Sequence, residues 1–265
     1  MTKLSIGYST CPNDTFIFDA MVHGKIDTEG LRFEPVLEDV ESLNGRAFHE
    51  DLDVTKVSYH AYLYIREKYA LMHSGSALGH NCGPLLICKN MVNVHELPSS
   101  RVGIPGKYTT ANLLLQLYLK KKIQAKIFLF SDIEAALLNE EIDAGVIIHE
   151  NRFTYETKSL KKIQDLGEFW ESQHQLPIPL GGIVIKKKFD EALRQKVDRV
   201  LKQSVQYAFD HPTASRDYVK KHAQEMDETV MQNHIALYVN AYTLDLGKTG
   251  RAAIERLIDV SREIL

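Results

Sequence analysis

Four groups of polar residues follow apolar runs that have the pattern of β-strands, and they hold most of the side chains suited to chemistry. They are Ser9–Thr15, Lys56–Tyr59, Gly106–Ala111 and His149–Glu150. Ligands of parallel α/β sheets bind beyond the carboxyl ends of the strands, so turns that leave such strands should meet at one cleft. Polar side chains beside helix-initiating N–H groups suit a small anion. We therefore expect these turns to line an anion-binding cleft.

The first turn reads Ser-Thr-Cys-Pro-Asn-Asp-Thr and stands between an expected strand and an expected helix. Asn13 or Asp14 can cap that helix, and Pro12 fixes the chain before it. Capping accounts for only one or two polar side chains in such a row. Ser9, Asn13 and Asp14 are therefore also candidates for ligand binding.

The second turn, Lys56-Val57-Ser58-Tyr59, precedes an amphipathic helix expected over Tyr59–Glu67. Ser58 has the position of a helix N-cap, and capping alone would account for it. The alternative is that this turn contributes donors to the cleft.

The third turn contains Gly106, which permits a tight turn, and Thr109 and Thr110, which precede a strong helix. Its N–H groups and the positive end of the helix dipole suit a carboxylate or a phosphate. The spacing is not that of a nucleoside-triphosphate loop, and the sequence has no dinucleotide-binding glycine fingerprint.

His149 follows the continuously apolar run Ala144–Ile148, which predicts a strand buried on both faces. A lone histidine is usually structural, but one at the end of a buried parallel strand faces the ligand cleft. A neutral imidazole there is suited to act as a general base near pH 7. Glu150 either orients it or is a surface charge.

No metal site is predicted. The 11 histidines are scattered without His-x-x-x-His or His-Glu-x-x-His spacing, and the three cysteines have no Cys-x-x-Cys pair. An odd number of cysteines also fits a reducing compartment rather than a disulfide framework.

Hydrophobic periodicity predicts the elements that must position these turns. Strands are expected at Leu4–Ser9, Leu31–Leu37, Val54–Val57, Pro84–Cys88, Val102–Ile104, Ile127–Phe130, Ala144–His149 and Ile183–Ile185. Helices are expected at Thr15–His23, Val40–Phe48, Tyr59–Glu67, Ala111–Lys121 and Ile133–Leu138. Strands that alternate with helices of this length predict an α/β fold with mainly parallel sheets.

From Phe189 onward the pattern predicts helices only. Apolar residues recur every four positions from Phe189 to Val205 and form one stripe. Pro212 ends that helix. Asp227 is the expected N-cap of a helix over Glu228–Val239, and Gly247 precedes a last helix that ends at Leu265.

Two segments have the composition of connections between lobes. Gly83–Asn93 is an apolar strand followed by polar residues, and Leu176–Gly182 is too rich in Pro and Gly for a helix. Two crossings let the middle of the chain form its own lobe. We therefore expect a larger α/β lobe from residues 1–89 and 177–265 and a smaller α/β lobe from residues 90–176.

The 265 residues are 44% hydrophobic and 25% charged, with a net charge of −3. This composition is typical of a globular protein and lacks the basic footprint of nucleic-acid binding. No apolar stretch approaches the ~20 residues of a membrane-spanning helix, and no apolar leader precedes the first strand. We expect a cytoplasmic monomer or homodimer without a nucleic-acid or membrane partner.

Taken together, these segments closely resemble the 1,4-dihydroxy-6-naphthoate synthase family of the futalosine route to menaquinone. The resemblance rests on Ser9 with Cys11–Phe16, on Lys56–Ala61, on Pro105–Ala111 and on Ile148–Tyr155. Leu176–Gly181 looks like a further family segment. The resemblance spans about residues 1–185, and the C-terminal helices add no distinctive motif.

The resemblance implies a two-lobed fold like that of type II periplasmic binding proteins, with a ligand cleft between the lobes. It also implies a lyase that converts cyclic dehypoxanthine futalosine to 1,4-dihydroxy-6-naphthoate without a cofactor or a metal. On the family pattern, a small carboxylated substrate is held by Lys56, Val57, Ser58, Thr109 and Thr110. His149 matches the proposed proton acceptor.

Two other functions stay open at this point. One is a chorismate dehydratase of the same pathway and a similar fold. The other is a non-catalytic protein that binds a small carboxylate. The segments Cys11–Phe16 and Ile148–Phe153 favour the synthase.

Overall fold

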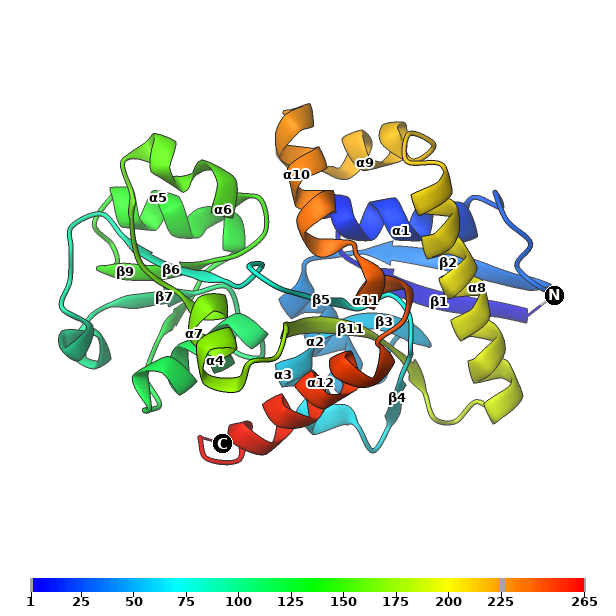
Figure 1. Cartoon of the computed structure of the whole chain (residues 1–265), viewed down its shortest axis with the longest axis horizontal. Coiled ribbons are helices and arrows are strands. Elements are labelled where there is room, and N and C mark those ends of the chain that lie inside the picture. The colour runs from blue at the N-terminus through cyan, green and yellow to red at the C-terminus, as the bar shows by residue number, and fades with distance from the viewer. Residues whose placement is uncertain (1, 225–226, 265) are drawn as a thin grey trace.

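The computed structural model describes residues 2–224 and 227–264, and its strands form two sheets along the long axis of the molecule (Figure 1). The six-stranded sheet has the order β2-β1-β3-β11-β4, with β5 also paired to β11. Its strands are β1 (Thr2–Tyr8), β2 (Leu31–Leu37), β3 (Val54–Ser58), β4 (Tyr69–Leu71), β5 (Ala77–Gly79) and β11 (Ile178–Lys186). The five-stranded sheet has the order β10-β6-β9-β7-β8. Its strands are β6 (Leu85–Cys88), β7 (Val102–Ile104), β8 (Lys126–Ile127), β9 (Ala144–Ile147) and β10 (Lys161–Asp165).

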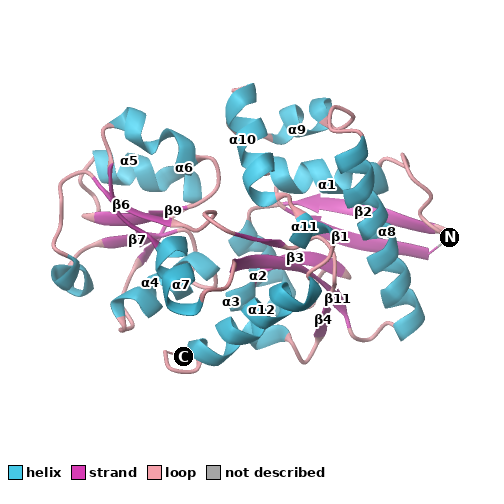
Figure 2. Ribbon diagram, in the orientation of Figure 1, coloured by secondary structure: helices cyan, strands magenta, loops and turns pink. Residues whose placement is uncertain are grey.

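Helices cover both faces of each sheet (Figure 2). Those of the first lobe are α1 (Pro12–Val22), α2 (Val40–Phe48), α3 (Tyr59–Ile65), α8 (Glu191–Asp210), α9 (Arg216–His222), α10 (Glu228–Tyr238), α11 (Ala241–Leu244) and α12 (Gly247–Ser261). Those of the second lobe are α4 (Thr110–Leu119), α5 (Ile133–Leu138), α6 (Asn151–Thr154) and α7 (Leu166–His174), with 3-10 turns at Val94–Ser99, Phe130–Asp132 and Tyr155–Lys158. None of the helices in the described residues is both long and apolar enough to cross a membrane.

Most predicted elements are present, with ends that differ by a few residues. The predicted bounds of β2, β7, α2 and α5 agree with the structure. The Asp227 side chain caps α10 as predicted, because it accepts hydrogen bonds from the N–H groups of Thr229 and Val230. The last helix ends at Ser261 instead of Leu265, and Leu265 lies outside the described residues.

The prediction of mainly parallel sheets is wrong for β11 and β6, the strands that begin where the chain passes from one lobe to the other. β1, β2 and β3 are parallel, but β11 runs antiparallel to β3, β4 and β5. In the second sheet β7 is parallel to β8 and β9, whereas β6 is antiparallel to β9 and β10. The parallel strands end at the cleft, so a strand that crosses from the other lobe starts there and runs the opposite way.

The structure also corrects the predicted strands and lobe boundary. The short strands β4, β5 and β10 were not predicted, and the strand expected over Ile127–Phe130 ends at Ile127. The crossing expected at Leu176–Gly182 leads into β11, which is extended from Ile178 onward with a register shift between Pro179 and Gly181. The expected larger lobe of residues 1–89 includes Leu85–Cys88, yet β6 pairs within the second sheet.

One hydrophobic cluster contains residues of both lobes. α12 contributes Ala253, Ile254, Leu257 and Val260, and these pack in one cluster with Leu113 and Trp170 of the second lobe. The same cluster includes Leu78 of β5 in the first sheet. A shared apolar core resists separation of the lobes because opening would expose it to water.

We predict that Leu257→Ala lowers the free energy of unfolding by about 2–5 kcal/mol, since the Leu257 side chain is fully buried in this shared cluster. Urea unfolding followed by circular dichroism measures the change. The exposed Glu255 on the same helix provides the control, because Glu255→Ala removes no core contact. Equal stability of the two variants would contradict a shared core.

Candidate active site

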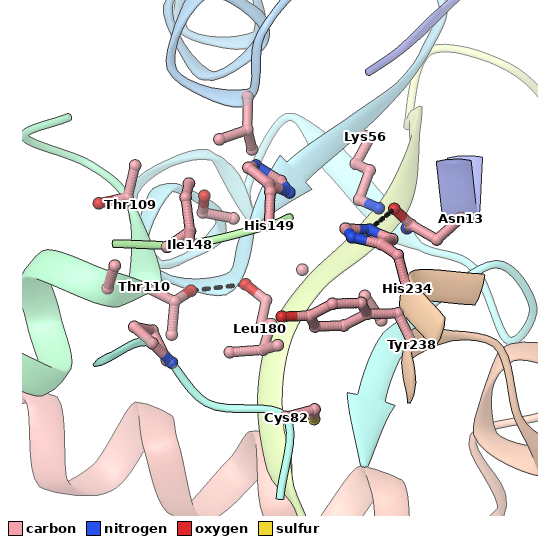
Figure 3. A pocket seen from close by; sticks show the side chains of 16 residues that line it. Asn13, Lys56, Cys82, Thr109, Thr110, Ile148, His149, Leu180, His234 and Tyr238 are labelled. Atoms are coloured by element: carbon pink, nitrogen blue, oxygen red, sulfur yellow. Dashed lines mark hydrogen bonds between the residues drawn. The ribbon is translucent and has the colours of Figure 1, made fainter. Parts of the chain in front are cut away.

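A cavity lies between the lobes, where β1, β3, β7 and β9 end (Figure 3). The predicted site residues that line it are Asn13, Lys56, Ser58, Thr109, Thr110 and His149. The other predicted site residues, Ser9, Asp14 and Val57, are not part of this lining. The structure therefore brings the four turns together at one cavity. Ser9, Asp14 and Val57 lie behind the residues that line it.

Asp14 connects the first two turns. Its carboxylate is fully buried and accepts hydrogen bonds from the Ser9 N–H at 3.0 Å and the Ser9 hydroxyl at 2.7 Å. It also accepts from the Asn13 side-chain amide at 2.8 Å and forms an ion pair with Lys56. Ser9 and Asp14 thus position the residues that face the cavity.

The expected capping of α1 by Asn13 or Asp14 is wrong. The N-cap residue is Cys11, which makes no side-chain cap bond, and Pro12 opens the helix. Asn13 and Asp14 fall in the first turn, and their side chains bond away from the helix backbone. Both side chains instead belong to the network around Lys56, with Asn13 on Asp14 and Asp14 on Lys56.

Lys56 is the cation at the cavity. Its side chain is nearly buried, with one of its ammonium donors on Asp14. An ammonium group has three donors, so two are left for a molecule in the cavity. The ion pair keeps this wall close to neutral while it still presents donors.

The capping role considered for Ser58 is not observed, since its side chain makes no cap bond to α3. Its hydroxyl instead accepts a hydrogen bond from the Asn44 amide at 3.2 Å. The Val57 side chain packs in the core with Ala61 and Val184, so Val57 can meet a ligand only through its backbone.

The third turn offers backbone donors rather than hydroxyls. The Thr109 hydroxyl donates to the Gly106 carbonyl at 2.8 Å, and the Thr110 hydroxyl donates to the Leu180 carbonyl of the crossing strand at 2.6 Å. The N–H groups of Thr110 and Ala111 begin α4 and have no acceptor among the described residues. The helix N-terminus therefore suits a carboxylate.

The turn at Gly106 also brings the chain close to Glu41 of α2. The N–H of Tyr108 donates to the Glu41 carboxylate at 3.1 Å. A Cβ at Gly106 would lie 2.4 Å from the Glu41 side chain, which would have to shift to make room for it. An acidic side chain of the protein itself thus occupies this part of the loop.

His149 lies just beyond β9, with a left-handed φ of 60° that costs energy for a residue other than glycine. Its Nδ1 is 3.3 Å from the Cys11 Sγ. Burial, and then the nearby Lys56 ammonium, lower its pKa to about 4. The ring is therefore neutral at pH 7, and Nε2 is the nitrogen left for a ligand.

Cys11 and Glu150 complete the surroundings of His149. Glu150 is buried and is not the surface charge that was one alternative. Ligand atoms of Cys11, His149 and Glu150 all lie within 4.8 Å of one another. Burial and the Glu150 charge raise the pKa of the Cys11 thiol well above its usual value, so the thiol keeps its proton.

Among the lining residues that the sequence analysis missed are His234 and Tyr238 of α10. His234 is fully buried, and its Nε2 is 2.9 Å from the Asn13 Oδ1 (Figure 3). The signal was present: His234 follows Met231 by three residues and precedes Tyr238 by four, which places it on the buried face of the helix.

The chain is similar to known proteins over nearly its whole length. The pattern of a menaquinone biosynthesis family matches residues 4–263. A 1,4-dihydroxy-6-naphthoate synthase of Thermus thermophilus is 42% identical over 257 residues, covering 97% of this chain and 93% of the relative. A protein of the same name from Streptomyces coelicolor is 40% identical over 260 residues, covering 96% and 91%.

Solved structures support the fold. A crystal structure of an Archaeoglobus fulgidus protein matches with a TM-score of 0.92 and 34% identity, covering 98% of this chain and 97% of that one. The periplasmic aliphatic sulphonate binding protein of Escherichia coli matches with a TM-score of 0.67 and 12% identity, covering 99% and 87%. This second likeness concerns the fold alone: two lobes of the periplasmic-binding-protein type.

We predict that Asp14→Ala lowers the free energy of unfolding by about 3–5 kcal/mol, since it leaves the Lys56 ammonium buried without its partner. The double variant Asp14→Ala/Lys56→Met should recover much of this loss. Urea unfolding of Asp14→Ala, Lys56→Met and the double variant gives the coupling energy. Removing Glu34 from its exposed pair with Lys3 should cost less than about 1 kcal/mol.

A second prediction concerns acid stability. Burial lowers the pKa of His60 and His149 to about 4 and that of His234 well below its usual value. The unfolded chain takes up protons below its histidine pKa of 6.5, while the folded chain does not. Stability should therefore fall as the pH drops from 6.5 toward 4, by about 2 kcal/mol per histidine at pH 5.

Urea unfolding at pH 7 and pH 5 tests this slope. His60→Asn should reduce it, because an amide can still donate to the Thr109 carbonyl but does not titrate in this range. The exposed His95 is the control, since His95→Asn should leave the slope unchanged. A His60→Asn slope equal to that of the wild type would argue against a buried neutral His60.

Proposed function

The chain belongs to the menaquinone biosynthesis family, and we propose that it is a 1,4-dihydroxy-6-naphthoate synthase, a lyase that acts on cyclic dehypoxanthine futalosine. The observation that carries the proposal is His149, a neutral imidazole at the cavity with Nδ1 beside Cys11 and Nε2 left for a substrate. Relatives of that name at 40% and 42% identity support the choice of reaction.

In this proposal His149 is the general base. In the proposed tautomer Nδ1 carries the hydrogen and donates it to the Cys11 sulfur, which leaves the lone pair on Nε2. Nε2 takes a proton from the substrate, and the electron pair of the broken bond drives cleavage of a carbon–carbon bond. Formation of the aromatic product favours the reaction. Positioned acid–base catalysis of this kind contributes ~10²–10⁴-fold to the rate.

The substrate carboxylate is proposed to bind at the start of α4. The N–H groups of Thr110 and Ala111 and the helix dipole favour a negative charge there. Lys56 and Ser58 add donors from the first lobe.

Two other functions are outcomes of the same test. The first is dehydration of chorismate, and the second is binding of a small carboxylate without catalysis. The proposed enzyme is cytoplasmic, needs no metal or cofactor and works as a monomer or a homodimer.

We predict that the wild-type protein releases 1,4-dihydroxy-6-naphthoate from cyclic dehypoxanthine futalosine and does not dehydrate chorismate, as followed by mass spectrometry. His149→Ala should fold, bind the product and lose at least ~10²-fold in turnover, because the proton acceptor is gone.

The exposed histidine variant His95→Ala is the matched control and should keep wild-type turnover. Near-normal turnover by His149→Ala would remove His149 from the mechanism. Loss of water from chorismate would assign the protein to the dehydratase instead. Product binding without turnover of either compound would leave only a binding protein.

A further inference from the structure

His234 is a buried polar residue of the cavity that the proposed reaction does not yet use. It lines the cavity from α10, an element outside the four polar turns. We propose that His234 is a substrate-binding residue whose Nδ1 accepts a hydrogen bond from a hydroxyl group of the substrate. This inference rests on the proposed function, because it assigns the hydroxylated part of that substrate to the α10 side of the cavity.

A chain of hydrogen bonds determines which nitrogen of His234 carries the proton. The Asp14 carboxylate only accepts, so the group that Asn13 turns toward it at 2.8 Å must be the amide Nδ2. The Asn13 Oδ1 therefore faces His234 Nε2 at 2.9 Å. An amide oxygen only accepts, so Nε2 carries the hydrogen and Nδ1 of the neutral ring has a free lone pair.

The ring stays neutral in this position. Burial lowers the pKa of His234 well below its usual value, and the positive charges of Lys56 and of a protonated His149 act in the same direction. Nδ1 is consequently an acceptor at neutral pH. An acceptor is suited to a hydroxyl donor and unsuited to a second carboxylate.

The Nδ1 atom is buried and has no hydrogen-bond partner among the described residues. A buried acceptor without a partner is unfavourable. The hydrogen bond to Asn13 uses only the Nε2 hydrogen of His234. It therefore leaves Nδ1 without a partner. A ligand hydroxyl in the cavity would supply the missing donor.

The position of the ring fits a role opposite the base. The rings of His149 and His234 are nearly parallel, with an interplanar angle of 20° and centroids 6.1 Å apart. Figure 3 shows His149 between His234 on one side of the cavity and Thr109 and Thr110 on the other. A substrate with its carboxylate at α4 would thus present a hydroxyl to α10 while His149 reaches the reacting proton.

Two substitutions of His234 separate the two nitrogens. In His234→Asn the amide oxygen can take the place of Nδ1, whereas the contact with Asn13 is lost. In His234→Gln the longer side chain can still donate to Asn13, but no acceptor stands at the Nδ1 place. Each variant therefore keeps one of the two interactions.

The experiment measures kcat and KM with cyclic dehypoxanthine futalosine for both variants. If Nδ1 binds the substrate, His234→Gln should lose about 10-fold in kcat/KM, with the larger part in KM, and His234→Asn should stay within about 3-fold of the wild type. A greater loss of kcat/KM in His234→Asn than in His234→Gln would mean that only the hydrogen bond to Asn13 matters. Wild-type kcat/KM in both variants would exclude contact between His234 and the substrate. Either result overturns the inference.

A measurement on the wild-type protein applies even where a variant fails to fold. Histidine labelled with nitrogen-15 reports hydrogen bonding to an unprotonated ring nitrogen by an upfield shift of its resonance. Saturation with 1,4-dihydroxy-6-naphthoate should move the Nδ1 resonance of His234, and an unmoved resonance would overturn the inference.

The failure of the inference differs from the failure of the proposed function. If the wild-type protein forms no naphthoate from the cyclic substrate, the proposed function fails and the inference fails with it. If the wild type is active and the two variants do not differ as described, only the role of His234 is rejected.

Discussion

Most of the cavity wall in the first lobe depends on one buried carboxylate. Asp14 accepts hydrogen bonds from Ser9 and Asn13 and pairs with Lys56, so it joins the end of β1, the start of α1 and the strand β3. A buried charge is costly unless each of its oxygens has partners. This requirement fixes the conformation of the first turn, the position of the Lys56 ammonium and, through Asn13, the orientation of His234.

The position of the second lobe relative to the first depends on the two strands at which the chain passes between the lobes. β6 and β11 each run from the cleft into a sheet whose parallel strands end at the cleft, and both are therefore antiparallel to their neighbours. The Thr110 hydroxyl donates to the Leu180 carbonyl on β11, which ties the start of α4 to the crossing strand. The cluster around Leu257 and Trp170 adds apolar contact between the lobes. Together these contacts hold His149 opposite Lys56.

A periplasmic sulphonate binding protein has the same fold, so the fold alone does not determine the chemistry of the cavity. Here two histidines, His149 and His234, are held neutral by burial and by the charge of Lys56. A cavity that only recognised an anion would gain from protonated rings. Neutral rings instead present lone pairs, which are suited to accept a proton or a hydroxyl hydrogen.

The sequence alone determined the α/β class, the position of most helices and the four polar turns, because periodicity and turn chemistry are local properties. It also pointed to His149, since a polar residue after a buried strand reaches the cleft in any fold of this class. It could not decide between capping and ligand binding at Ser58 or Asp14, because a hydroxyl or carboxylate satisfies either partner equally well. Only the tertiary structure brought Asn44 to Ser58, Lys56 to Asp14, and His234 to Asn13 across 221 positions of the chain. Such contacts depend on how the lobes and helices pack, and no spacing along the chain encodes them.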